Sequence, residues 1–169
     1  MDNLETTNVI VRRLRPDDLD AVIALDARNT GRRREEYFKL KLAYALSDTG
    51  VEVSLAAEAD GMFAGFLLVR VYYGEFGSTE QVAMLDTLGV HPARRGHGVG
   101  RALMRQLCTN LLGLGIRALQ TEVGWENQEL LAFFHHEGFR PAQRLCLDLD
   151  LERSRTRDEA VEALRTRAH

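Results

Sequence analysis

The chain has 169 residues and contains little cysteine and no long apolar run, and each scarcity excludes a class of protein. Two cysteines are too few for a disulfide framework or a cysteine-rich zinc site. No apolar stretch reaches the roughly 18 residues that a membrane helix needs. The first residues also lack the charged-then-apolar layout of a signal peptide. We therefore expect a cytoplasmic protein with no membrane partner.

Lysine is scarce, and almost all of the positive charge is arginine. The formal net charge is −3, so the chain lacks the basic face that binding to a phosphate backbone requires. This excludes nucleic acid as the expected partner. The lysines are Lys39 and Lys41. Guanidinium groups, which suit bidentate contact with carboxylates and phosphates, are therefore the expected cations of any anion site.

The length and an apolar fraction of 45% suffice for a single hydrophobic core. Hydrophobic periodicity predicts an α/β fold, with strands over residues 8–14, 51–59, 62–73, 82–90, 118–125 and 139–151 and helices over 15–29, 34–46, 99–115 and 127–138. Asp60-Gly61 tolerates positive φ angles and predicts a tight hairpin turn. We expect one domain over residues 1–151, followed by a tail, 152–169, that is helical or frayed.

A glycine-rich turn between the strand at 82–90 and the helix at 99–115 is the most informative segment. Gly96, Gly98 and Gly100 alternate there, so several backbone N–H groups can converge on one anion without hindrance from side chains. The amino terminus of the following helix adds unsatisfied donors and a positive dipole end. Arg95 and Arg101 can add charge-assisted hydrogen bonds. The turn is therefore predicted to hold a phosphate or pyrophosphate.

Two common phosphate-binding patterns do not fit this turn. A dinucleotide fingerprint needs G-x-G-x-x-G after the first strand, whereas the spacing here is G-x-G-x-G past mid-chain. A nucleoside-triphosphate loop needs a Gly-Lys pair, and no lysine follows residue 41. A third pattern, [QR]-x-x-G-x-[GA], fits in full as Arg95-Gly96-His97-Gly98-Val99-Gly100.

This pattern and three other stretches give the chain a resemblance to the GNAT superfamily of acyl-CoA-dependent N-acetyltransferases. The other stretches are the opening segment through Pro16, the hairpin at 56–66 and the segment 126–139. They stand in the family's order, and the resemblance extends over roughly residues 8–150, nearly the whole chain. The resemblance implies a mixed, mostly antiparallel central sheet of six to seven strands with flanking helices.

The resemblance further implies a coenzyme A site and no metal. In the family, the turn after the fourth strand binds the pyrophosphate, and the pantetheine arm lies along that strand. Carried over to this chain, the cofactor-binding positions are Leu88, Gly89, Val90, Arg95, Gly96, His97, Gly98, Val99, Gly100, Arg101, Asn127 and Phe134. Asn127 is equally well explained as a helix cap. His135 and His136 are adjacent on a helix and cannot both face one metal ion.

Direct attack of an amine on acetyl-CoA needs a group that takes the amine's proton, because an alkylamine has a pKa of about 10.4. Asp86 matches the position at which many family members carry an acidic residue, and Glu122 is the second candidate base; for either one, a strand carboxylate without a catalytic role is the alternative. Phe134 stands where the family commonly has a tyrosine that protonates the departing thiolate. That acid is therefore replaced by water, Tyr72, Tyr73 or His135, or is absent.

The expected reaction is acetyl transfer from acetyl-CoA to a primary amine of a small molecule or peptide in a ternary complex. The alternative is a non-catalytic acyl-CoA-binding regulatory module, which the phenylalanine at 134 favours. The arginines at 32–34 favour an acidic acceptor, whereas Glu75, Glu80 and the neighbouring aromatic residues favour a cationic one, so the acceptor stays open. A homodimer also stays open.

Overall fold

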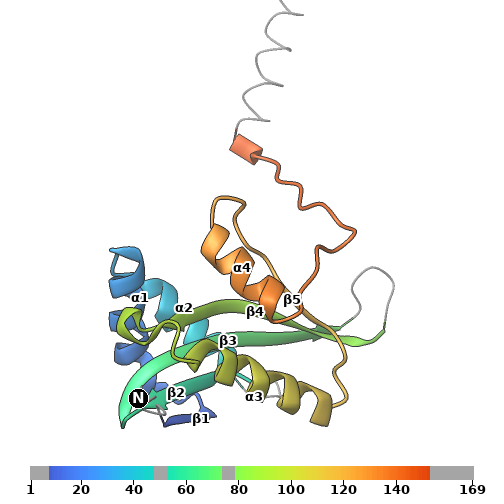
Figure 1. Ribbon diagram of the computed structural model, residues 1–169. Coiled ribbons are helices and arrows are strands. Elements are labelled where there is room, and N and C mark those ends of the chain that lie inside the picture. Colours follow the sequence, from blue (N-terminus) through green and yellow to red (C-terminus); the bar gives the residue numbers. More distant parts are fainter. Residues whose placement is uncertain (1–7, 48–52, 74–78, 153–169) are drawn as a thin grey trace, which may run out of the picture. The chain divides into compact units, whose positions relative to one another are not determined.

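The computed structural model describes residues 8–47, 53–73 and 79–152 (Figure 1). The chain divides into two compact units, Met1–Glu137 and Gly138–His169. The helices and strands named below lie in the first unit. Residues 153–169 of the expected tail, and Glu75 of the expected acceptor loop, lie outside the described residues.

The first unit is built on a twisted sheet in the order β1-β2-β3-β4-β5. Its strands are β1 (Val9–Arg13), β2 (Leu55–Ala59), β3 (Met62–Tyr73), β4 (Gln81–Val90) and β5 (Leu119–Thr121). The first four pair antiparallel and β5 pairs parallel to β4. The predicted hairpin is confirmed, because Asp60 and Gly61 join β2 to β3 with φ angles of 52° and 75°.

The prediction of six to seven strands is wrong for the residues that the structure describes, which form five. The expected strand at 118–125 is reduced to the three residues of β5, and the expected strand at 139–151 is not formed. In the second unit, Leu145, Leu147 and Leu149 are each more than 70% exposed. The alternating pattern was present in the sequence, but a strand also needs a backbone partner, and alternation does not specify one.

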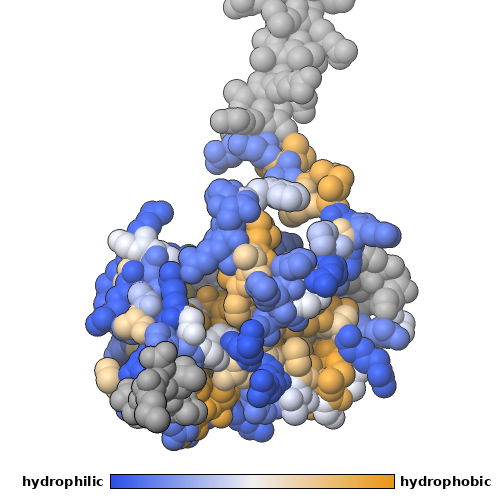
Figure 2. Space-filling model, in the orientation of Figure 1, coloured by the Kyte–Doolittle hydropathy of each residue, from blue (hydrophilic) through white to orange (hydrophobic). Residues whose placement is uncertain are grey.

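Helices cover both faces of the sheet. Two lie on one face, α1 (Leu19–Thr30) and α2 (Glu35–Ala45), and α3 (Val99–Gly113) lies on the other (Figure 1). The short helices η1 (Pro16–Asp18) and η3 (Pro92–Arg94) precede α1 and α3, and α4 (Gln128–His136) follows β5. The predicted α/β architecture is confirmed. Figure 2 shows mostly hydrophilic residues on the visible face, with apolar patches between them. Within the described residues, no helix is long and apolar enough to cross a membrane.

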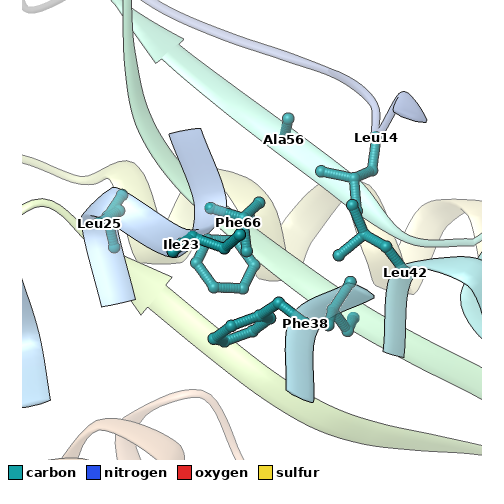
Figure 3. Packing of buried hydrophobic residues seen from close by; sticks show 9 residues of the cluster. Leu14, Ile23, Leu25, Phe38, Leu42, Ala56 and Phe66 are labelled. Carbon is teal, nitrogen blue, oxygen red and sulfur yellow. The ribbon is translucent and has the colours of Figure 1, made fainter. Parts of the chain in front are cut away.

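The core between α1, α2 and the sheet is an apolar cluster (Figure 3). Its members are Leu14, Val22, Ile23, Leu25, Phe38, Leu42, Ala56, Phe66 and Leu68. Phe38 and Phe66 meet edge to face, with ring centroids 5.9 Å apart. A Cβ at Gly89 would lie 2.6 Å from Phe66 Cε1. Position 89 on β4 must therefore be glycine for this core to pack, whatever its role toward a ligand.

An ion cluster joins β1 to the start of α1. Arg12 donates to both carboxylate oxygens of Asp18 at 2.8 Å and to Glu58 at 2.7 Å, which raises the pKa of Arg12. Burial by itself raises the pKa of Asp18, but the hydrogen bonds from the Arg12 side chain and the Arg15 backbone N–H outweigh burial and lower it. The Asp18 carboxylate is thus held ionised and tied to the sheet edge.

Candidate active site

A cavity of about 630 Å³ opens where the end of β4, the glycine turn and three helices meet. The end of α1 and the α1–α2 connection form one side, and the start of α3 and one face of α4 form the others. Its lining consists of Asp26, Asn29, Thr30, Arg34, Thr87, Leu88, Gly89, Val90, Arg94, Arg95, Gly96, Gly98, Val99, Gly100, Arg101, Asn127, Glu129, Leu130, Phe133, His136 and Glu137. Ten of the twelve sequence-predicted cofactor positions therefore line one cavity, and His97 and Phe134 do not.

The glycine turn has the backbone shape that its sequence predicted. Gly96 and Gly98 have φ angles of 76° and 83°, in the left-handed region that side chains disfavour. Nothing lies within 4 Å of a Cβ built on either residue, so the demand for glycine is conformational and not steric. Gly98 is the N-cap of α3. The first N–H groups of a helix have no partner within it, and the residues that carry them here, Gly98–Arg101, line the cavity.

Gly100 is glycine for a different reason. A Cβ there would lie 3.2 Å from Phe133 Cε2 and 3.3 Å from Phe133 Cζ. The missing side chain thus lets the first turn of α3 approach α4 closely. The three glycines of the motif therefore shape the backbone at two positions and make room for a helix contact at the third.

Each arginine beside the turn is already held by an acidic side chain. Arg94 pairs with Asp60 of the hairpin at 2.8 Å. Arg95 donates to Asn29 Oδ1 at 2.9 Å and lies 3.7 Å from Glu129, and Arg101 lies 3.6 Å from Glu137. A guanidinium carries five N–H donors, so these contacts orient the arginines and leave donors for an anion. The chemistry of the donor set fits a pyrophosphate.

Strands β4 and β5 stop pairing at the level of the two predicted catalytic carboxylates. Their ladder joins Ala83–Leu85 to Leu119–Thr121 and ends just before Asp86 on one strand and Glu122 on the other. Beyond that point Leu88–Val90 pairs with β3 alone. The open edge of β4 lies in the cavity wall, where a linear amide chain can bind to it as an added strand.

Asp86 occupies a bulge in β4. Leu68 of β3 pairs with Thr87 and the next residue, Val69, pairs with Leu85, so Asp86 is the extra residue between them. Its carboxylate accepts from Lys41 at 3.1 Å and from Arg70 at 3.0 Å, and its side chain is 13% exposed. Both carboxylate oxygens are thus occupied by cations.

Glu122 differs from Asp86 in its surroundings. It is exposed, and no ion pair joins it to another described residue. Neither carboxylate is part of the cavity wall itself, although Thr87, adjacent to Asp86, is. The structure therefore gives the two predicted candidates unequal environments at the same level of the sheet.

At the start of α4, Asn127 is both a helix cap and a residue of the cavity wall, the two alternatives that the sequence left open. Asn127 is the N-cap of the helix, where its side chain accepts from Leu130 N–H at 3.2 Å, and it also lines the cavity. Phe134 is 4% exposed and packs inward, while its neighbour Phe133 faces the cavity. The ring of His97 lies back on the turn, with Nδ1 2.9 Å from the carbonyl of Arg95.

Of the candidate acids, Tyr72 donates to Gln120 at 3.0 Å and Tyr73 is 69% exposed. Neither lines the cavity, and nor does His135; the histidine in the wall is His136. Sequence reasoning considered His136 only as a metal ligand and named its neighbour His135 as a candidate acid. It also missed Phe133, for which the only signal was the doubled phenylalanine on α4.

The α1–α2 connection contributes an ion pair to the wall that the sequence indicated only in part. Of the three consecutive arginines, Arg34 lines the cavity and holds the buried Asp26 through two hydrogen bonds of 2.6 and 2.9 Å. The hydrogen bond and charge of Asp26 raise the pKa of Arg34. Asp26 gave no motif signal, since it stands within an ordinary helical pattern. No cluster of three or more metal-ligating side chains occurs among the described residues.

Comparison with known proteins places these features in one family. The model of the acetyltransferase (GNAT) family matches residues 19–139. Aminoglycoside N(6')-acetyltransferase type 1 of Stenotrophomonas maltophilia is 32% identical over 107 residues, which cover 62% of this chain and 70% of that protein. Mycothiol acetyltransferase of Clavibacter michiganensis is 30% identical over 132 residues, which cover 75% of this chain and 40% of that protein.

Two solved structures show the same fold. Aminoglycoside N-acetyltransferase AAC(6')-Iy in complex with CoA has a TM-score of 0.72 at 18% identity, covering 86% of this chain and 96% of that one. Ribosomal-protein-alanine N-acetyltransferase from Brucella melitensis has a TM-score of 0.68 at 19% identity, covering 85% of this chain and 100% of that one.

Proposed function

Because the chain belongs to the GNAT acetyltransferase family and is an acetyl-CoA-dependent N-acetyltransferase, we propose that the cavity between β4, α3 and α4 is its active site. One observation carries the proposal. The glycine turn at the start of α3 opens into the same cavity in which β4 loses its β5 partner. The same cavity thus offers an anion cradle and an open strand edge. The cradle suits the pyrophosphate of a long cofactor, and the strand edge suits its amide-bearing arm.

Each part of the site has a separate task in this proposal. The N–H groups at Gly98–Arg101 and the guanidinium of Arg95 bind the pyrophosphate. The open edge of Leu88–Val90 hydrogen-bonds the pantetheine arm, and Phe133 packs against it. The bound acetyl-CoA supplies an activated thioester. The protein's contribution is then to hold an amine beside it and to remove a proton from that amine.

Glu122 takes that proton, directly or through a water molecule. It is exposed, and the structure gives it no ion pair with another described residue, so its oxygens can accept. Asp86, whose two oxygens already accept from Lys41 and Arg70, positions those cations and does not act as the base. No acid from α4 is needed at position 134, because a thiolate leaves readily without one.

The acceptor is a primary amine of a small molecule or of a peptide. The two curated relatives are named for an aminoglycoside and for mycothiol, and the Brucella structure is named for alanine of a ribosomal protein. These names cover both classes of amine. The acceptor therefore has to be inferred from this chain's own surface beside Glu122 and Asp86.

The direct test is to incubate the protein with acetyl-CoA and a panel of amines and to follow thiol release. We expect release that depends on both the amine and the protein. Calorimetric titration with CoA, run in parallel, separates binding from turnover. Tight CoA binding with no thiol release for any amine would contradict the proposed site chemistry and support the regulatory-module alternative.

A further inference from the structure

Two carboxylates on the face of the sheet that carries α1 and α2 share one arrangement, in which a largely buried carboxylate lies beneath more exposed cations. Asp86 is held by Lys41 at 3.1 Å and Arg70 at 3.0 Å, and Asp26 is held by Arg34 at 2.6 Å. The side chains of Asp26 and Asp86 are 7% and 13% exposed, whereas those of Arg34 and Arg70 are 40% and 47% exposed. Solvent therefore meets the cations of this surface first.

Tyr37 joins these cations into one surface, the cationic patch, defined by Arg34, Lys41 and Arg70. The Cζ atom of Arg34 lies 4.9 Å from the ring centroid of Tyr37, and the Nζ atom of Lys41 lies 5.7 Å from it. Contacts of this kind hold a cation against an aromatic face and restrict its motion. The patch thus runs without a break from the cavity wall at Arg34 to the bulge of β4.

The patch has unused binding capacity. Its three cations stand over two carboxylates, which leaves one net positive charge. Among the hydrogen bonds between described residues, Arg70 donates to Asp86 through Nε alone. Both of its terminal NH₂ groups can therefore bind another anion, and a planar guanidinium suits a carboxylate in particular.

The carboxylate of Glu122 follows β5, the strand next to the β4 bulge at which the cationic patch ends. Glu122 directly follows β5, and Asp86 stands at the same level on β4. Paired neighbouring strands lie about 4.8 Å apart, and both acidic residues directly follow the last pair of the ladder. Lys41 and Arg70 lie 3.1 and 3.0 Å from the Asp86 carboxylate. An amine at Glu122 would therefore have a cation within the length of an amino acid.

We propose that the acceptor carries a carboxylate close to its reactive amine, and that Arg70 and Lys41 bind this carboxylate while Glu122 receives the amine. The inference rests on the proposed function and names the acceptor class of the same site. A zwitterionic acceptor matches the pair of opposite charges. A polycation such as an aminoglycoside would instead bring its additional ammonium groups against the cationic patch, which costs binding energy.

The first test compares acceptors that differ only in the carboxylate. L-Leucine is assayed against L-leucinamide, and a glutamyl peptide amide against its glutaminyl counterpart, with spermidine as a polycation. We expect kcat/KM to favour the carboxylate member of at least one pair by about tenfold, which corresponds to 1.4 kcal/mol. Preference within the first pair identifies an amino-acid carboxylate, and preference within the second identifies an acidic side chain of a peptide.

The second test uses Arg70→Gln, with Arg105→Gln as the matched control because Arg105 is exposed on α3, on the opposite face of the sheet. Arg70→Gln should lower kcat/KM about tenfold for the carboxylate acceptor and leave the amide analogue within about twofold. Arg105→Gln should change neither. An equal loss for both acceptors would show that Arg70 only supports the fold, and would overturn the assignment.

A binding measurement keeps this inference separate from the proposed function. N-acetyl-L-leucine and N-acetyl-L-leucinamide are titrated calorimetrically into the protein saturated with CoA. Tighter binding of the carboxylate, abolished by Arg70→Gln, supports the patch even if no amine is acetylated, in which case the proposed function fails alone. Equal binding of the two probes, binding of neither, or faster turnover of spermidine would overturn the acceptor assignment.

Discussion

The cofactor side and the acceptor side of the cavity are assembled in different ways. The cofactor side comes from one continuous segment, in which β4 runs through the glycine turn into α3. The proposed acceptor side is assembled from α1, α2, β3 and β4 through ion pairs between residues distant in sequence, and Glu122, which follows β5, takes no part in them. A local segment can keep its geometry while the rest of the chain changes. The acceptor side can change its specificity by exchanging one distant partner.

The largest expected effect separates the two acidic residues of the acceptor side. Glu122→Gln removes the proposed base, so kcat should fall about 100-fold or more. Asp86→Asn should lower kcat by less than about tenfold and act mainly on KM, because Asp86 positions Lys41 and Arg70. Steady-state kinetics on both variants shows which of the two carboxylates acts as the base. The reverse order would identify Asp86 as the base.

A second prediction addresses the cofactor side through backbone shape. Gly98→Val forces a β-branched residue into a φ of 83° and should weaken CoA binding on the order of 100-fold. Gly113→Val is the matched control, since a Cβ at either glycine meets nothing within 4 Å and Gly113 lacks a positive φ. Calorimetry measures the affinity and circular dichroism checks the fold. Equal losses in both variants would mean that the turn does not hold the pyrophosphate.

The contrast between a continuous cofactor segment and a dispersed acceptor side also explains which parts of the site could be predicted from the sequence. Gly96, Gly98 and Gly100 stand within five residues, and their spacing alone indicated an anion cradle. Asp86 meets Lys41 across 45 residues of sequence and Arg70 across 16, and no local pattern encodes such a pairing. The pairing of Asp86 with two cations could therefore be identified only from the three-dimensional structure.

The expected strand count failed for a related reason. The hairpin at Asp60-Gly61 was predictable because the turn and both strands are adjacent in sequence. The segment ending at Leu151 has an equally regular alternation, yet a strand is defined by its partner, which a period of two does not name. The role of Gly100 escaped prediction likewise, because it depends on Phe133 from another helix.

A third prediction tests that contact. Gly100→Ala places a Cβ 3.2 Å from Phe133 Cε2, which should weaken CoA binding about tenfold by displacing α4. Adding Phe133→Leu should recover part of the loss, since a smaller side chain makes room for the methyl group. A double-mutant cycle on the CoA dissociation constants measures this coupling. Strict additivity would show that Gly100 serves the cradle through its own backbone and not through α4.

The smallest effect on activity is expected at Asp18, which stands at the start of α1, pairs with Arg12 of β1 and does not line the cavity. Asp18→Asn removes the ion pair with Arg12 and should lower the free energy of unfolding by about 1–3 kcal/mol at neutral pH. Because the pKa of Asp18 is lower in the folded chain than in the unfolded one, its contribution is present above about pH 3.9 and disappears as the pH falls through the folded value.

Denaturant unfolding of wild type and variant from pH 7 to pH 2 should therefore give two stabilities that converge in acid. Asp17→Asn, at an exposed neighbouring position, should follow wild type throughout. The affinity for CoA should stay within about twofold in all three proteins, because the cradle is a continuous local segment and neither Asp18 nor Arg12 lines the cavity. A parallel loss of CoA affinity in Asp18→Asn would instead show that the two sides of the cavity are coupled through the sheet, and that the cradle is less autonomous than its sequence pattern indicates.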